Sequence, residues 1–267
     1  GLYRARESPN DFAILNRDLN VLSEWGKRWL ITFNAQKTKY IIFSRRKKPK
    51  YKFPIYFGSV QIERVKSHKH LGIVFYENMT WNEHIELIIS KTSKRINILV
   101  GLQFRFPRIC LENIYKSMIR PILEYGDVIY DSLPTGLSNE LEKVQRRAAL
   151  ACTGAYRHTK HTVLLIDLGW DLLAIRRKCH RLVLLYKIVN NLTQPYVKLI
   201  LPSTNANQIT YHLRNIHNLK LPICKSEMTR KAFVYKTIID WNNLGLEISQ
   251  CHTLSLFKFN IKKLWCN

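Results

Sequence analysis

Residues 80–102, TWNEHIELIISKTSKRINILVGL, mark the point where the sequence changes from strand-like to helical patterning. The first four residues match a capping box, in which the Thr80 and Glu83 side chains would each accept a hydrogen bond from the other residue's backbone amide. Apolar residues then recur every three or four positions, at Trp81, Ile85, Ile88, Ile89, Ile96, Leu99 and Leu102. This spacing predicts a long amphipathic helix that begins near residue 80.

Before this helix the sequence predicts a small α/β part. A first helix should have Ser8 as its N-cap and Pro9 as its first residue, and its apolar stripe places Trp25 and Trp29 in a core. Runs rich in β-branched and aromatic residues predict four strands, at residues 37–44, 53–57, 60–65 and 70–75. The stretch RRKKPKYK at residues 45–52 is expected to be a hairpin loop, with six cations in eight residues.

After this part the patterning is helical. Further helices are predicted at residues 107–121, 138–152, 171–189, 228–242 and 253–265, with a loop at 202–218. Pro121 should break or kink the first of these helices, because proline removes a backbone hydrogen bond and clashes with the preceding turn. Gly154 should end the second. The fold class is therefore α+β, with a small antiparallel β/α part followed by a predominantly helical body.

The charge of the chain is strongly positive, with 43 Lys and Arg against 19 Asp and Glu and a formal net charge of +24. Residues 1–72 hold 16 basic and 5 acidic side chains, residues 73–154 hold 10 and 9, and residues 155–267 hold 17 and 5. Two basic ends around a near-neutral middle, with aromatic residues among the cations, favour a nucleic-acid partner. A merely cationic soluble protein and a membrane-surface binder are the alternatives.

Several classes of protein are excluded or disfavoured by composition. The ten glycines have at least nine residues between any two, which excludes glycine-rich nucleotide-binding loops. The six cysteines are scattered without a Cys-x-x-Cys pair, which disfavours a disulfide framework or a zinc ribbon and favours reduced intracellular thiols. No apolar run is long enough for a transmembrane helix, and the N-terminus has neither a signal-peptide core nor an initiating Met. The chain is therefore expected to be a piece of a longer protein.

The order of short motifs along the chain resembles the end of a reverse transcriptase of non-LTR retrotransposons, and most closely the jockey-like, LINE-type elements. The motifs are Trp25-x-x-x-Trp29, Phe33-Asn34, Lys37-Thr38, Phe43-Ser44, His68 to Gly72, Trp81-x-x-His84-Ile85, Tyr115, Ile119 to Gly126, Leu141 to Ala149, Leu168-Gly-Trp170, Arg176-Arg177, Tyr186 to Asn190, Leu213-Arg-Asn215 and Trp241-Asn242. They span essentially the whole chain.

The resemblance implies a C-terminal fragment of an RNA-directed DNA polymerase. Residues 1–77 would be the end of the palm with its primer-grip hairpin, residues 78–154 the thumb, and residues 155–267 a basic helical extension. Its partners would be template RNA, primer or target DNA and the missing N-terminal half of the polymerase, in the nucleus and cytoplasm and without a membrane.

By the same resemblance, Lys37 would approach the pyrophosphate of the incoming nucleotide, where a cation could neutralise the leaving group. The alternative is an ordinary lysine at the start of a strand. Leu71 and Gly72 match the primer grip, where a glycine lets the backbone approach the primer strand closely. An ordinary hairpin turn is the alternative there.

Catalysis by such a polymerase requires carboxylates that hold Mg²⁺, and this sequence contains no Asp-Asp pair. The chain alone is therefore predicted to be inactive and to hold no cofactor, although the full-length polymerase would need Mg²⁺. Glu124, Asp127 and Asp131 would share one helical face and could form the metal site of a nuclease. The alternative is a solvated or capping role for these three residues.

Thirteen cations in three clusters are the candidate phosphate contacts: Arg45, Arg46, Lys47, Lys48, Lys50 and Lys52 in the loop, Lys143, Arg146 and Arg147 in the helix at 138–152, and Arg176, Arg177, Lys178 and Arg181 in the helix at 171–189. Such contacts would position a duplex without reading its sequence. A plain solvated surface is the alternative for each cluster. A non-catalytic RNA- or DNA-binding remnant is the alternative for the whole chain, and a metal-dependent nuclease is a weaker one.

Overall fold

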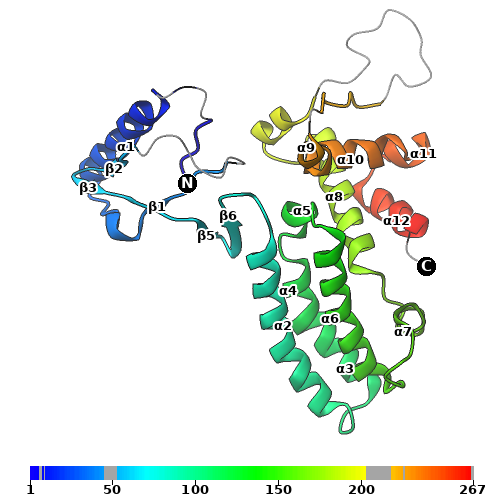
Figure 1. Cartoon of the computed structure of the whole chain (residues 1–267). Helices are drawn as coiled ribbons and strands as arrows, with labels where there is room; N and C mark the ends of the chain where they lie inside the picture. The colour runs from blue at the N-terminus through cyan, green and yellow to red at the C-terminus, as the bar shows by residue number, and fades with distance from the viewer. Residues whose placement is uncertain (6–7, 9, 45–52, 203–217, 225, 266–267) are drawn as a thin grey trace, which may run out of the picture. The chain divides into compact units, whose positions relative to one another are not determined.

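A computed structural model of the chain describes all of residues 1–267 except 6–7, 9, 45–52, 203–217, 225 and 266–267 (Figure 1). The chain forms two compact units, unit 1 at Gly1–His84 and unit 2 at Ile85–Asn267. Helices predominate and the strands are few and short, which confirms the α+β class in its coarse form. The three-part division at residues 77 and 154 stays a prediction. None of the described helices is long and apolar enough to cross a membrane.

Among its described residues, unit 1 combines one α-helix with three two-stranded sheets. Its elements are α1 (Asp11–Arg28), the 3₁₀ turn η1 (Ala35–Lys37), β1 (Lys39–Tyr40), β2 (Tyr56–Phe57), β3 (Val60–Gln61), β4 (Glu63–Arg64), β5 (Ser67–His70) and β6 (Ile73–Tyr76). Strands β2 and β3 pair antiparallel, as do β5 and β6, whereas β1 and β4 pair in parallel. The described strands are shorter than the predicted runs, and the single strand predicted at 70–75 is wrong, because residues 71 and 72 form the turn between β5 and β6. The predicted antiparallel pairing holds for two of the three described sheets and not for β1 and β4.

Both predicted helix starts in unit 1 were placed too early. Helix α1 begins at Asp11, whose carboxylate accepts a hydrogen bond of 2.6 Å from the Ser8 amide. Helix α2 (Asn82–Leu102) begins two residues after Thr80. The Thr80 amide and hydroxyl both donate to Oδ1 of Asn78, at 3.0 and 2.7 Å, so this local turn replaces the capping box.

The core of unit 1 lies between α1 and β2, where Phe12, Leu19, Ile55, Phe57 and Ile62 are buried. The stripe of α1 is not covered along its whole length. Trp25 is 46% exposed and Trp29 is 64% exposed, so their assignment to a core was wrong.

The regular elements of unit 2 are all helices among its described residues. Its elements after α2 are α3 (Arg108–Ile114), the π-helical segment η2 (Tyr115–Ile119), α4 (Arg120–Glu124), α5 (Asp127–Tyr130), α6 (Thr135–Thr153), α7 (His161–Leu168), α8 (Leu173–Val189), η3 (Pro195–Ile200), α9 (Glu227–Lys231), α10 (Phe233–Asn242), α11 (Leu246–Ser249) and α12 (Leu254–Trp265). Helices α8, α10 and α12 enclose a core of Leu182, Leu185, Ile238, Trp241, Phe257 and Ile261. The predicted loop at 202–218 lies almost entirely outside the described residues.

Pro121 does not break its helix. The turn before it widens into the π-helical segment η2, in which the amide of Arg120 donates to the carbonyl of Tyr115 five residues earlier. Prolines and π turns both accompany kinks in helices, so the predicted break is wrong, whereas the predicted kink stays a prediction. The end of α6 is as predicted, because Gly154 adopts φ +64° and its amide donates to the Leu150 carbonyl.

Candidate nucleic-acid interface

The hairpin of β5 and β6 places Leu71 and Gly72 at its tip. His70 pairs with Ile73, so only two residues form the turn, and both have positive φ, +47° for Leu71 and +88° for Gly72. Such turns match the twist of the strands and favour Asn-Gly, because asparagine and glycine tolerate the left-handed region. Leu71 therefore holds a strained backbone while its side chain is 77% exposed.

Replacing Leu71 by asparagine should stabilise unit 1 by about 1 kcal/mol, because the strain at the first turn position would be relieved. Urea denaturation at unchanged m-value measures the shift. Leu71→Ala is the matched control, since alanine removes the side chain but keeps the strain. An equal gain from both variants would show that the exposed side chain, and not the backbone, carries the cost.

Lys37 is the last residue of η1 and is exposed. Its amide donates to Oδ1 of Asn34 at 2.9 Å. This hydrogen bond caps the short turn and fixes the backbone position of Lys37. The role of its ammonium group stays a prediction. The six cations of residues 45–52 lie outside the described residues.

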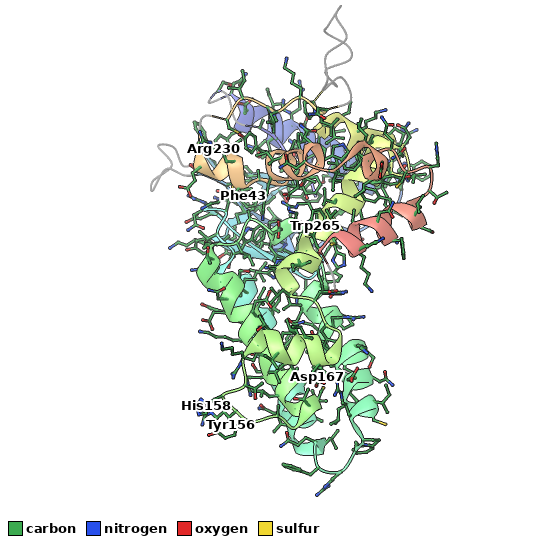
Figure 2. The ribbon with its side chains drawn as sticks, turned by 90° about the vertical axis from the view of Figure 1, so that its right-hand side faces the viewer. Phe43, Tyr156, His158, Asp167, Arg230 and Trp265 are labelled. Carbon is green, nitrogen blue, oxygen red and sulfur yellow. The ribbon has the colours of Figure 1, made fainter. Side chains whose placement is uncertain are left out.

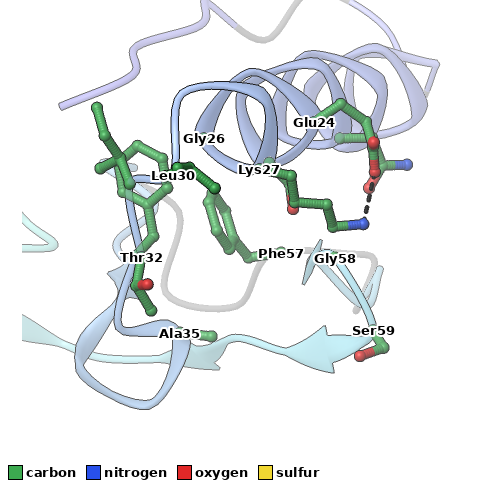
Figure 3. A pocket seen from close by; sticks show the side chains of 13 residues that line it. Glu24, Gly26, Lys27, Leu30, Thr32, Ala35, Phe57, Gly58 and Ser59 are labelled. Carbon is green, nitrogen blue, oxygen red and sulfur yellow. Dashed lines mark hydrogen bonds and ion pairs between the residues drawn. The ribbon is translucent and has the colours of Figure 1, made fainter.

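A hollow of about 940 Å³ adjoins the C-terminal end of α1 (Figure 3). Phe57 of β2 and Leu30 contribute apolar surface to it. Its two charged lining residues, Glu24 and Lys27, pair with each other at 2.7 Å. The hollow therefore presents apolar and neutral polar groups, and it supplies no set of titratable groups for catalysis.

The candidate cations of α8 point largely into unit 2. Arg177 is 3% exposed and Arg181 is 1% exposed, and both guanidinium groups lie against the carboxylate of Asp131, at 3.4 and 3.1 Å. Arg177 also donates to the Ser138 hydroxyl at 2.7 Å, and Arg181 donates to Asp240. A phosphate could reach either guanidinium only after rearrangement of this packing.

The other two cations of this cluster are also paired. Arg176 contacts Glu124 and Asp171, and Lys178 lies 3.1 Å from Asp240 and 4.3 Å from the centre of the Trp265 ring. Their placement explains how a helix rich in cations can pack inside a domain, because carboxylates from neighbouring helices neutralise it.

The acidic residues proposed for a nuclease site each contact a basic side chain. Glu124 pairs with Arg176, Asp127 lies 2.6 Å from Nδ1 of His180, and Asp131 pairs with the buried arginines. Burial raises the pKa of Asp127, and the His180 ring opposes that shift. Among the described residues no three acidic, histidine or cysteine side chains are grouped to hold a metal ion. These carboxylates therefore fit structural ion pairs better than a Mg²⁺ site.

Helix α6 carries cations on two faces. Lys143 is exposed and pairs with Glu140 at 2.6 Å, and the exposed Arg147 donates to Asn97 of α2 at 3.1 Å. Arg146 instead bonds two backbone carbonyls, those of Arg157 at 2.6 Å and Thr159 at 3.0 Å.

Two exposed lysines of α2 extend the surface on which Arg147 lies, and the sequence predictions did not include them. Lys91 and Lys94 precede Asn97 at three-residue steps, so they lie on the same side of the helix. Neither has a carboxylate partner among the described residues. We define the α2–α6 face as Lys91, Lys94, Lys143 and Arg147. The three-residue spacing of the lysines was a signal that could have been found in the sequence.

This chain is similar in sequence to polymerases of mobile elements. A probable RNA-directed DNA polymerase from transposon X-element of Drosophila melanogaster is 25% identical over 150 residues, 55% of this chain and 16% of that protein. A probable RNA-directed DNA polymerase from transposon BS of the same fly is 27% identical over 158 residues, 58% of this chain and 17% of that protein. No family model and no solved structure matches the chain.

The class of protein that these matches define is the RNA-directed DNA polymerase of non-LTR retrotransposons, to which this chain is similar over about half its length. The RNA-directed DNA polymerase from mobile element jockey of Drosophila melanogaster is among them, at 25% identity over 145 residues. The resemblance seen in the short motifs is thereby confirmed. The chain spans about one sixth of the length of these relatives.

Proposed function

We propose that this chain is the C-terminal part of a retrotransposon reverse transcriptase, and that it positions template RNA and primer or product DNA. The similarity to four RNA-directed DNA polymerases carries the proposal. In this proposal residues 1–77 hold the end of the palm, residues 78–154 form the thumb, and residues 155–267 form a basic extension.

The chemistry of nucleotide transfer is assigned to another part of the polymerase. The sequence has no Asp-Asp pair. Glu124 and Asp131 form ion pairs with arginines, and Asp127 contacts the His180 ring. The chain alone should therefore show no DNA synthesis and no Mg²⁺-dependent cleavage. This chain's own residues bind and orient nucleic acid.

Two surfaces of the described chain suit that role. At the tip of the β5–β6 hairpin, Leu71 and Gly72 are exposed, and in this proposal they contact the primer strand. On the α2–α6 face, Lys91, Lys94 and Arg147 would gain from release of counterions when they meet the phosphates of an RNA–DNA hybrid, whereas Lys143 is paired with Glu140. A non-catalytic remnant would bind nucleic acid in the same way. DNA synthesis by a complete polymerase that contains this chain would distinguish the reverse transcriptase from such a remnant.

The binding role is tested by the salt dependence of affinity for an RNA–DNA hybrid. Changing Lys91, Lys94 and Arg147 together to glutamine should make the slope of log K against log[salt] less steep by between about two and three, since each phosphate contact contributes about 0.9. The matched control changes three exposed lysines of α12 to glutamine, Lys258, Lys262 and Lys263. An unchanged slope in the first variant would contradict a role for the α2–α6 face, and a loss in the α12 variant would show that the basic extension also contacts the hybrid.

A further inference from the structure

Two loops of unit 2 expose aromatic side chains beside cations. The first joins α2 to α3 and contains Phe104, which is 90% exposed, and Phe106, which is 47% exposed, on either side of Arg105. The second joins α6 to α7 and contains Tyr156, which is 75% exposed, followed by Arg157. With Lys160 these residues define what we name the two-loop surface.

Both loops lie at one end of the helical unit. In Figure 1 the α2–α3 connection forms the lower tip, and in Figure 2 Tyr156 and His158 project side by side from the lower part of the same unit. An ion pair joins the elements that follow them, because Arg108 at the start of α3 lies 3.0 Å from the carboxylate of Asp167 in α7.

The cations of the two-loop surface are not neutralised by the chain. Arg105, Arg157 and Lys160 are exposed and have no carboxylate partner among the described residues. This differs from the arginines of α8, which are paired inside the unit. The surface therefore presents positive charge together with exposed aromatic rings.

Arg146 of α6 holds the backbone of the second loop in place. Its guanidinium group donates to the carbonyls of Arg157 and Thr159, and the Thr159 amide donates to the Tyr156 carbonyl at 2.9 Å. The ring of His158 lies 5.3 Å from that of Tyr156. A side chain that is positioned before binding loses less entropy when a ligand stacks on it.

We propose that the two-loop surface binds a single-stranded segment of nucleic acid, with bases stacked on Phe104 and Tyr156 and phosphates on Arg105, Arg157 and Lys160. Successive bases of a single strand expose their faces for stacking, whereas those of a duplex are covered by their neighbours. This proposal rests on the proposed function. It adds that the nucleic acid bound at the two-loop surface is single-stranded. Arg146 is a positioning residue that acts through the backbone of the second loop.

The test compares a single-stranded oligonucleotide of about ten nucleotides with an RNA–DNA hybrid, each followed by fluorescence anisotropy on the full chain. Changing Phe104 and Tyr156 together to alanine should weaken single-strand binding by about tenfold or more, because each lost stack corresponds to roughly a fivefold to hundredfold change. Hybrid binding should change by less than twofold. Separate RNA and DNA oligonucleotides show which backbone is preferred.

Matched variants separate stacking from folding. Phe259→Ala removes an aromatic ring that is 65% exposed on α12 and should leave single-strand binding intact. Tyr156→Phe should keep the affinity, and Arg146→Met should weaken single-strand binding while hybrid binding persists. Changing Arg105, Arg157 and Lys160 together to glutamine should reduce the single-strand salt slope by about two, at roughly 0.7 per contact.

Unchanged single-strand binding in both the aromatic and the charge variants would overturn the proposal. The proposal would also be overturned if these variants lost binding to anionic phosphatidylserine vesicles but kept oligonucleotide binding, since the surface would then bind a membrane. Failure of the wild type to bind the hybrid would instead contradict the proposed function. The two results are therefore distinguishable.

Discussion

Replacing Asp131 by asparagine should lower the free energy of unfolding of unit 2 by about 3–5 kcal/mol. Asp131 is 9% exposed, and its carboxylate faces Arg177, Arg181 and Lys236, the last at 2.7 Å. Asparagine keeps the shape but removes the charge. Arg177 would then be a buried cation without a carboxylate partner among the described residues, and such a cation is strongly destabilising.

Urea denaturation followed by circular dichroism measures this loss as a lower midpoint at unchanged m-value. Glu140→Gln is the matched control, because Glu140 forms an ion pair with Lys143 at an exposed site of α6. That variant should change stability by less than about 1 kcal/mol. If Asp131→Asn were as mild as the control, the buried arginines would have to be neutralised in some other way.

The local features of the fold could be predicted from the sequence, and the pairings between distant residues could not. The end of α6 follows from Gly154 alone, because a helix commonly ends at a glycine in the left-handed conformation. The long helix α2 follows from its own periodicity. By contrast, the parallel pairing of β1 with β4 joins residues 24 positions apart in runs of only two residues, for which no local pattern exists.

The same limit applies to the candidate site. A cluster of cations in a sequence is equally consistent with a phosphate-binding site and with a set of buried ion pairs whose carboxylates lie elsewhere in the chain. Arg177 and Arg181 are four residues apart and so share a helix face, yet their partner Asp131 lies some fifty residues earlier. Only the tertiary structure shows that this face is buried. The Leu71–Gly72 turn was placed by the family resemblance alone, because the strand predicted from the residue pattern, at 70–75, runs through the turn between β5 and β6.

The sequence pattern also did not show which aromatic residues are exposed. Trp25 and Trp29 lie on a helical stripe, yet β2 covers only part of α1 and leaves both exposed. Phe257 and Phe259 are two residues apart in α12 and have opposite environments. In a helix, residues two positions apart point about 200° from each other around the axis, which accounts for the difference.

Replacing Phe257 by alanine should destabilise unit 2 by about 3–5 kcal/mol. The ring is fully buried, and its centre lies 4.4 Å from that of Tyr186 and 5.7 Å from that of Trp241. It thereby joins α12 to α8 and α10, and alanine would leave a cavity among three helices. The same helix provides the control, since Phe259→Ala removes an identical side chain that is 65% exposed and should cost less than about 1 kcal/mol. Equal urea midpoints for the two variants would mean that α12 does not pack on α8 through this ring.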